Sequence, residues 1–183
     1  MEKFLLTENR IPTKYFVTKG KGQDKDAIHP GSYDAAVRDA KMENWNGVGY
    51  TSLLPPDAKQ VPIPENYLHG SELMMIMARC DCNKGQKANA ALGKAWVCNE
   101  KGDKVGGLVA EYSKIGETID EKIAVETLRK SLNRMFKRRK YPSHYELREN
   151  EVVGYESIVP EETFGTALVA IGFVEYKTKI LEQ

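Results

Sequence analysis

The chain has 183 residues, enough for one ordinary domain, and its 41% hydrophobic content is sufficient for a substantial core. Its 27 Lys and Arg residues almost balance its 26 Asp and Glu residues, and the formal net charge is +1. This balance argues against a strongly basic nucleic-acid-binding domain and against an acidic tail. The longest uncharged apolar stretch, residues 166–174, is far shorter than the roughly 20 residues that span a bilayer.

Residues 1–10 contain too short an apolar segment for a secretory signal and no small-residue cleavage site. Cys80, Cys82 and Cys98 are odd in number, which fits a reducing compartment better than a disulfide framework, and we expect buried or half-buried thiols. The three histidines are scattered, so no zinc site is expected. The sequence therefore predicts a cytoplasmic protein of one domain, residues 1–183, without metal and with neither nucleic acid nor a membrane as its partner.

The first third of the chain predicts two strands separated by a loop and a helix. Residues 13–19 have the β-branched and aromatic content of a strand, and the polar, glycine-containing residues 20–31 are typical of a loop. A short alanine-rich helix is expected over residues 32–42, with Ser32 as its N-cap. Strand character returns at residues 48–54 and ends at two prolines, which cannot donate to a strand ladder.

The rest of the chain predicts five strands and one long helix. Residues 91–98 and 105–112 are expected to form a hairpin, because turn-forming residues lie between them. The helix is expected to begin at the capping box of residues 118–121 and to end before Pro142. Several strands with few helices at irregular intervals favour an α+β fold over a doubly wound parallel sheet. The other strands are expected at residues 73–80, 151–159 and 166–176, and the apolar side of the helix comprises Ile119, Ile123, Leu128, Leu132, Met135 and Phe136.

A basic run, Lys137-Arg138-Arg139-Lys140, falls at the carboxyl end of this helix, where cations face the negative end of the helix dipole. We interpret the run as a solvated helix terminus rather than as a phosphate-binding patch. The run leaves open one alternative function, the binding of nucleic acid or another polyanion through Lys137–Lys140. Such binding would weaken steeply with added salt.

The usual phosphate-loop, nucleophile-elbow, zinc-protease and dinucleotide-binding motifs are absent. The distinctive stretch is residues 32–56, SYDAAVRDAKMENWNGVGYTSLLPP. This stretch resembles the pyruvoyl-dependent arginine decarboxylases, especially the bacterial branch known from chlamydiae. The resemblance covers roughly residues 12–176 and includes the blocks HGSELMMIMA, KANAALG, GGLVAEY and FGTALVAIGF. These blocks in this order are specific, whereas a Thr-Ser pair alone would carry no information.

The resemblance implies a proenzyme that cleaves itself between Thr51 and Ser52, giving a β chain of residues 1–51 and an α chain of residues 52–183. A hydroxyl on the residue after the scissile carbonyl can attack it through a five-membered ring and convert the amide into an ester. Elimination of the ester leaves dehydroalanine at position 52, which becomes a covalent pyruvoyl group as ammonia is released. That ketone reacts with the substrate amine and accepts electrons as carbon dioxide leaves, so neither pyridoxal phosphate nor metal is expected.

Three further site residues follow from the resemblance. Glu111, in GGLVAEY, matches the family's proposed proton donor, and desolvation beside an apolar strand would raise the pKa of its carboxyl. Asn46 matches the asparagine that orients the scissile peptide and later the substrate, because a neutral amide can donate to an oxyanion without titrating. Asp34 matches the acid of the substrate pocket, where a carboxylate can accept two parallel bonds from a guanidinium.

The family resemblance implies conversion of L-arginine to agmatine and carbon dioxide by an αββα sandwich. It also implies trimers of αβ protomers, sometimes doubled to hexamers, with active sites between protomers. Decarboxylation consumes a proton, so acid resistance and polyamine supply are both consistent roles. Pro30 stands where the archaeal pattern has leucine near the substrate, and decarboxylation of lysine, ornithine or histidine by the same chemistry is the alternative.

Overall fold

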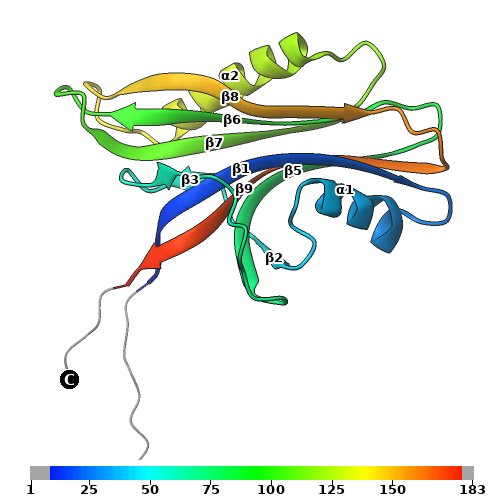
Figure 1. The fold of residues 1–183 in the computed structure, drawn as a ribbon. Coiled ribbons are helices and arrows are strands. Elements are labelled where there is room, and N and C mark those ends of the chain that lie inside the picture. Colours follow the sequence, from blue (N-terminus) through cyan, green and yellow to red (C-terminus); the bar gives the residue numbers. More distant parts are fainter. Residues whose placement is uncertain (1–8, 179–183) are drawn as a thin grey trace, which may run out of the picture.

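The computed structural model describes residues 9–178 and places two β-sheets face to face, with one helix on the outer side of each (Figure 1). The first sheet has the strand order β2-β5-β9-β1-β4, and the second has the order β3-β7-β6-β8. The chain is thus a mixed α and β protein with separate helices and sheets, in agreement with the α+β prediction. Residues 1–8, on which the expectation of no secretory signal largely depends, lie outside the described residues.

Three long strands form the body of the first sheet: β1 (Ile11–Asp24), β5 (Glu72–Asn83) and β9 (Phe164–Lys177). The central strand β9 pairs antiparallel with both of its neighbours and is almost continuously apolar, because one of its faces meets the second sheet and the other lies beneath a helix. The sheet ends in two short strands. These are β2 (Asn46–Gly49), parallel to β5, and β4 (Lys59–Gln60), parallel to β1.

The second sheet is built on the predicted hairpin. Strands β6 (Ala88–Cys98) and β7 (Lys104–Ile115) pair antiparallel, and β8 (Glu146–Ile158) pairs with the other edge of β6. Every residue of β6 is buried, since the strand is central in its sheet and is covered on both faces. The two-residue strand β3 (Leu53–Leu54) completes the sheet beside β7.

Helix α2 (Glu121–Arg138) covers the outer face of the second sheet but begins later than the capping box predicted. Asp120 is its N-cap, and the Asp120 carboxylate accepts a hydrogen bond of 2.9 Å from Ile123 N. Leu128 and Leu132 are buried as predicted, whereas Ile123 is 43% exposed. The buried row is Ala124, Leu128 and Leu132, because residues four apart on a helix face the same neighbour.

Helix α1 (Tyr33–Asp39) lies on the outer face of the first sheet and is shorter than the predicted 32–42. Ser32 occupies the N-cap position of α1, as predicted, but its side chain does not cap the helix, because its buried hydroxyl lies 2.9 Å from Thr166 Oγ1. The prediction of a loop over residues 20–31 is wrong at both ends, because residues 28–31 belong to the short π-helix η1 (Ile28–Ser32) that precedes α1. Residues 20–24 continue β1, since β9 offers them partners that local sequence does not reveal.

Close packing of α1 on β1 gives a first testable consequence. A Cβ atom on Gly20 would lie 2.2 Å from Ala36 O, so Gly20→Ala forces the helix backbone to move. We expect this substitution to lower the free energy of unfolding by about 2 kcal/mol. Gly49→Ala is the matched control, because a Cβ there meets no atom within 4 Å, and it should change stability by less than about 0.5 kcal/mol. Urea unfolding followed by circular dichroism measures both, and equal losses would contradict this packing.

Cys80, Cys82 and Cys98 are buried free thiols, as predicted, and burial raises the pKa of Cys80 and of Cys82. Within residues 9–178, no three His, Cys, Asp or Glu side chains come together in a way that could hold a metal ion. No helix in this described part of the chain is long and apolar enough to cross a membrane.

Candidate active site

Residues 48–54, predicted as one strand, are divided between the two sheets. Strand β2 ends at Gly49 in the first sheet, and Tyr50 N still donates to Met75 O of β5 at 2.7 Å. Strand β3 then pairs with β7 in the second sheet. The Thr51–Ser52 peptide is therefore the point at which the chain crosses from one sheet to the other. Alternation of apolar residues could not predict this division, because its period is the same in either sheet.

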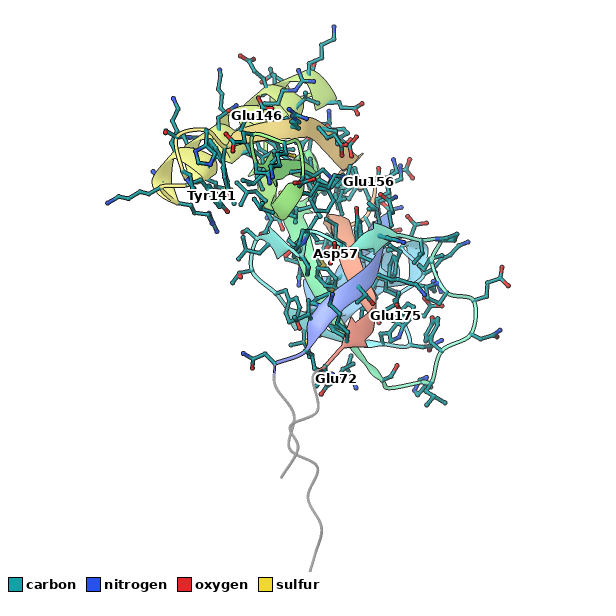
Figure 2. All side chains as sticks on the ribbon, turned by 90° about the vertical axis from the view of Figure 1, so that its left-hand side faces the viewer. Asp57, Glu72, Tyr141, Glu146, Glu156 and Glu175 are labelled. Atoms are coloured by element: carbon teal, nitrogen blue, oxygen red, sulfur yellow. The ribbon has the colours of Figure 1, made fainter. Side chains whose placement is uncertain are left out.

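After the crossing, the chain turns back and reaches β4 at the opposite edge of the first sheet. Figure 2 views this flank of the molecule, and Asp57, in the turn after β3, lies between Glu146 of β8 and Glu175 of β9. The segment from β2 to β4, which contains the predicted cleavage site, therefore connects the two sheets.

Backbone hydrogen bonds hold the crossing on both sides. Val109 N of β7 donates to Ser52 O at 3.0 Å, and Leu53 N donates to Thr51 O, also at 3.0 Å. Upstream of the crossing, the ring of Tyr50 packs against that of Phe173, with centroids 5.3 Å apart. Thr51 is exposed and Ser52 is half-buried. The predicted scissile peptide is thus accessible and yet fixed to both sheets.

An open, mostly apolar groove of about 570 Å³ adjoins the crossing. Arg10 brings a positive charge to it, and its guanidinium lies 5.0 Å from the ring centroid of Tyr176. Burial raises the pKa of Tyr176 to about 12, so its phenol stays neutral beside the cation. The groove is lined by Arg10, Ile11, Pro12, Gly49, Tyr50, Thr51, Leu53, Leu54 and Pro55.

Glu111 lies on β7 close to the crossing. Its strand position is two residues beyond Val109, a separation of about 7 Å, and both side chains belong to the face of β7 that is turned toward the first sheet. The Glu111 side chain as a whole is exposed, but partial burial of its carboxyl still raises its pKa. A carboxyl with a raised pKa keeps its proton to higher pH, which suits a proton donor.

Asn46 lies at the far end of β2 from the crossing, and β2 alone spans about 10 Å. Asn46 Nδ2 donates to Gly70 O at 2.7 Å, and its backbone N donates to Ser71 O at 2.8 Å. The first of these bonds uses one of the two N–H groups of the side-chain amide. The structure therefore fixes Asn46 in place but does not bring it beside Ser52 of the same chain.

Asp34 is exposed in the first turn of α1. Because α1 packs on the outer face of the first sheet, that sheet separates Asp34 from Glu111, which belongs to the second sheet. Within one chain, the structure thus brings together Ser52, Thr51 and Glu111 but places Asn46 and Asp34 elsewhere.

The sequence did not indicate the groups that hold the crossing. The N–H groups of Leu53 and Val109 are backbone groups. Every residue except proline has such a group, so no residue type in the sequence marks these two. Arg10 lies outside any motif, and only the fold places it in the groove with Thr51.

Comparisons with known proteins identify the family of the chain. The profile of the family described as pyruvoyl-dependent arginine decarboxylase matches residues 14–178. The proteins named pyruvoyl-dependent arginine decarboxylase AaxB of Chlamydia muridarum and Chlamydia pneumoniae are 33% and 32% identical to the chain, and each alignment covers 92% of this chain and 93% of the relative. Pyruvoyl-dependent arginine decarboxylase 2 of Methanosarcina mazei is 38% identical over 58% of each chain. The chain therefore belongs to the family of pyruvoyl-dependent arginine decarboxylases.

Proposed function

We propose that this protein is made as a proenzyme, cleaves itself between Thr51 and Ser52, and then converts L-arginine to agmatine and carbon dioxide. The observation that carries the proposal is the crossing. The only residue types that can start such a cleavage bear a hydroxyl or a thiol, and here Ser52 follows the exposed residue Thr51 at the point where the chain passes from one sheet to the other. The family assignment supports the reaction and its substrate.

Cleavage begins when Ser52 Oγ attacks the carbonyl carbon of Thr51, and the C–N bond breaks as the nitrogen gains a proton. The resulting ester loses the Thr51 carboxylate by elimination, and water then replaces nitrogen at position 52, which leaves as ammonia. The larger chain is therefore expected to be about 17 Da lighter than the same chain with an amino-terminal serine.

The residues at the crossing fit the pyruvoyl group, because elimination at a serine leaves the three-carbon unit from which that group forms, and position 52 is held beside β7. Once formed, the ketone supplies an electrophile for the substrate amine and a sink for the electrons left by carbon dioxide. Glu111 then holds the proton that the decarboxylated carbon receives. No metal or pyridoxal phosphate takes part in this proposal.

We propose that the active site is shared between protomers, with Asp34 and Asn46 supplied by one chain and Ser52 and Glu111 by its neighbour. The separation of these two pairs within one chain supports this arrangement. In the site, the Asp34 carboxylate would bind the substrate guanidinium and the Asn46 amide would orient the reacting carbonyl. The assembly is proposed to be a trimer or hexamer of αββα sandwiches in the cytoplasm.

The intact mass of the purified protein under denaturing conditions tests the first half of the proposal. Two chains that correspond to residues 1–51 and 52–183, the larger with a blocked amino terminus, are expected. Carbon dioxide release from arginine, lysine, ornithine and histidine tests the second half. A site built for a guanidinium leaves polar groups unpaired with a shorter amine, so arginine should be strongly preferred. A single uncut chain, or no advantage for arginine, would refute the corresponding half.

Mixed oligomers test the shared site. Asp34→Asn and Glu111→Gln chains, each inactive by itself, are expected to recover activity when they are co-expressed with different affinity tags and purified through both. If neighbouring chains supply the two carboxylates, each trimer that carries both tags has both intact residues in one of its three sites, so about a third of the sites recover. Recovered arginine decarboxylation measures this fraction. Verified mixed oligomers without recovery would place both residues in one chain's site.

A further inference from the structure

We propose that the backbone N–H of Leu53 is a catalytic group for self-cleavage, because it donates to the carbonyl oxygen on which negative charge develops. The inference deepens the proposed function and rests on cleavage between Thr51 and Ser52. Self-cleavage of this precursor would then depend on a hydrogen bond made by the cleaved segment itself.

The geometry places this N–H where an oxyanion donor is needed. Leu53 N lies 3.0 Å from Thr51 O, the oxygen of the predicted scissile carbonyl. The bond closes a three-residue turn with Ser52, the predicted nucleophile, at its centre. Donors that stabilise oxyanions lie about 2.7–3.1 Å from the oxygen. The precursor therefore holds this donor in place before the reaction begins.

The pairing of β3 with β7 explains why the N–H of Leu53 is available. Bonded and non-bonded positions alternate along an antiparallel pair, and Ser52 occupies a bonded position, since its carbonyl accepts from Val109 N. Leu53, opposite Leu108, therefore occupies a non-bonded position, and its N–H points away from β7. Strand β3 is also the edge of its sheet, so no further strand of this sheet takes up that N–H.

The chemistry makes this donor more important in the transition state than in the resting precursor. When Ser52 Oγ bonds to the carbonyl carbon of Thr51, the π electrons of the carbonyl move to Thr51 O and form an oxyanion. The oxyanion then collapses, the C–N bond breaks, and the hydroxyl proton of Ser52 ends on the released amine. Because the full negative charge exists only between these steps, the Leu53 N–H lowers the barrier rather than merely stabilising the turn.

A backbone ester at position 53 tests the inference. Cell-free synthesis of the full chain with α-hydroxyisocaproic acid at position 53 keeps the leucine side chain but replaces its N–H by oxygen. We expect the two cleaved chains to form about 100-fold more slowly than in wild type, the usual cost of one lost oxyanion donor. Leu53→Ala keeps the N–H and measures separately what the leucine side chain contributes.

A second ester separates the loss of the oxyanion donor from a weaker attachment of the crossing to β7. The ester at position 53 also makes Ser52 O a poorer acceptor, which weakens its hydrogen bond from Val109 N. The matched control is therefore α-hydroxyisovaleric acid at position 109. It removes the Val109 N–H that donates to Ser52 O but leaves the N–H of Leu53 intact. The ester at 53 should slow cleavage much more than the ester at 109. If wild type cleaves and the ester at 53 cleaves as fast as wild type or as the ester at 109, the role of Leu53 is overturned. If wild type itself never cleaves, the proposed function fails instead.

Discussion

Ser52→Ala is expected to remain one uncut chain of 183 residues and to show no measurable arginine decarboxylation. Without the hydroxyl, no group at position 52 can attack the Thr51 carbonyl, and alanine has no leaving group from which a pyruvoyl ketone can form. Intact mass measurement reports the cleavage, and carbon dioxide release from arginine reports the activity. Both should be lost together, because the second depends on the product of the first.

Ser113→Ala is a suitable control for this experiment, since Ser113 is an exposed serine of the same strand as Glu111 and should be dispensable. It is expected to cleave and to decarboxylate as wild type does. If Ser52→Ala still yielded two chains, the cleavage site would lie at another bond, and the significance of the crossing between the sheets would be lost.

Glu111→Gln is expected to cleave normally but to decarboxylate arginine at least about 100-fold more slowly, because a glutamine amide cannot deliver the proton that the substrate carbon needs. Glu117→Gln, which changes an exposed glutamate just beyond β7, is the control and should retain full activity. Intact mass and steady-state kinetics on the same preparations separate processing from catalysis. Normal turnover by processed Glu111→Gln would exclude Glu111 as the proton donor.

The pH dependence of turnover identifies Glu111 more directly. Burial raises the pKa of its carboxyl, so the protonated form persists to higher pH than in an ordinary glutamate. A proton donor is active below its pKa, so kcat should fall as pH rises through this raised value. The residual activity of Glu111→Gln should lack this alkaline decline. The same decline in the variant would assign the titration to another group.

Ser52→Ala and Glu111→Gln together define the order of the two reactions, self-cleavage and decarboxylation. Ser52→Ala blocks the first reaction and therefore the second, whereas Glu111→Gln blocks only the second. A variant that cleaves slowly but then turns over normally, as expected for the ester at position 53, belongs to neither class. These three behaviours distinguish a residue that makes the electrophile from one that uses it.

Local pattern was sufficient for much of the fold. The hairpin of β6 and β7, the long helix α2 and the strand character of β5, β8 and β9 follow from short-range alternation, turn residues and helical periodicity. Boundaries were less accurate. The first helical turn was assigned to Thr118 rather than Asp120, because both can cap a helix and only the path of the preceding turn selects one.

Such local patterns do not indicate which side chains from distant strands contact one another. Lys94 lies on β6 and is only 7% exposed, and its ammonium is 2.8 Å from Glu151 of β8 and 3.2 Å from Tyr15 OH of β1. Partners from two other strands make burial of this charge tolerable, since a buried ammonium without them would carry a large desolvation cost. No spacing within residues 91–98 indicates either partner.

The sequence by itself indicated the family of this protein and predicted its reactive residues, a serine after a possible scissile carbonyl and a glutamate in a matching motif. Only the tertiary structure decided where these residues lie. It splits residues 48–54 between two sheets, sets Ser52 beside the strand of Glu111, and leaves Asp34 and Asn46 apart from them. The physical reason is that residue type fixes reactivity, whereas sheet membership depends on hydrogen-bond partners far away in the chain.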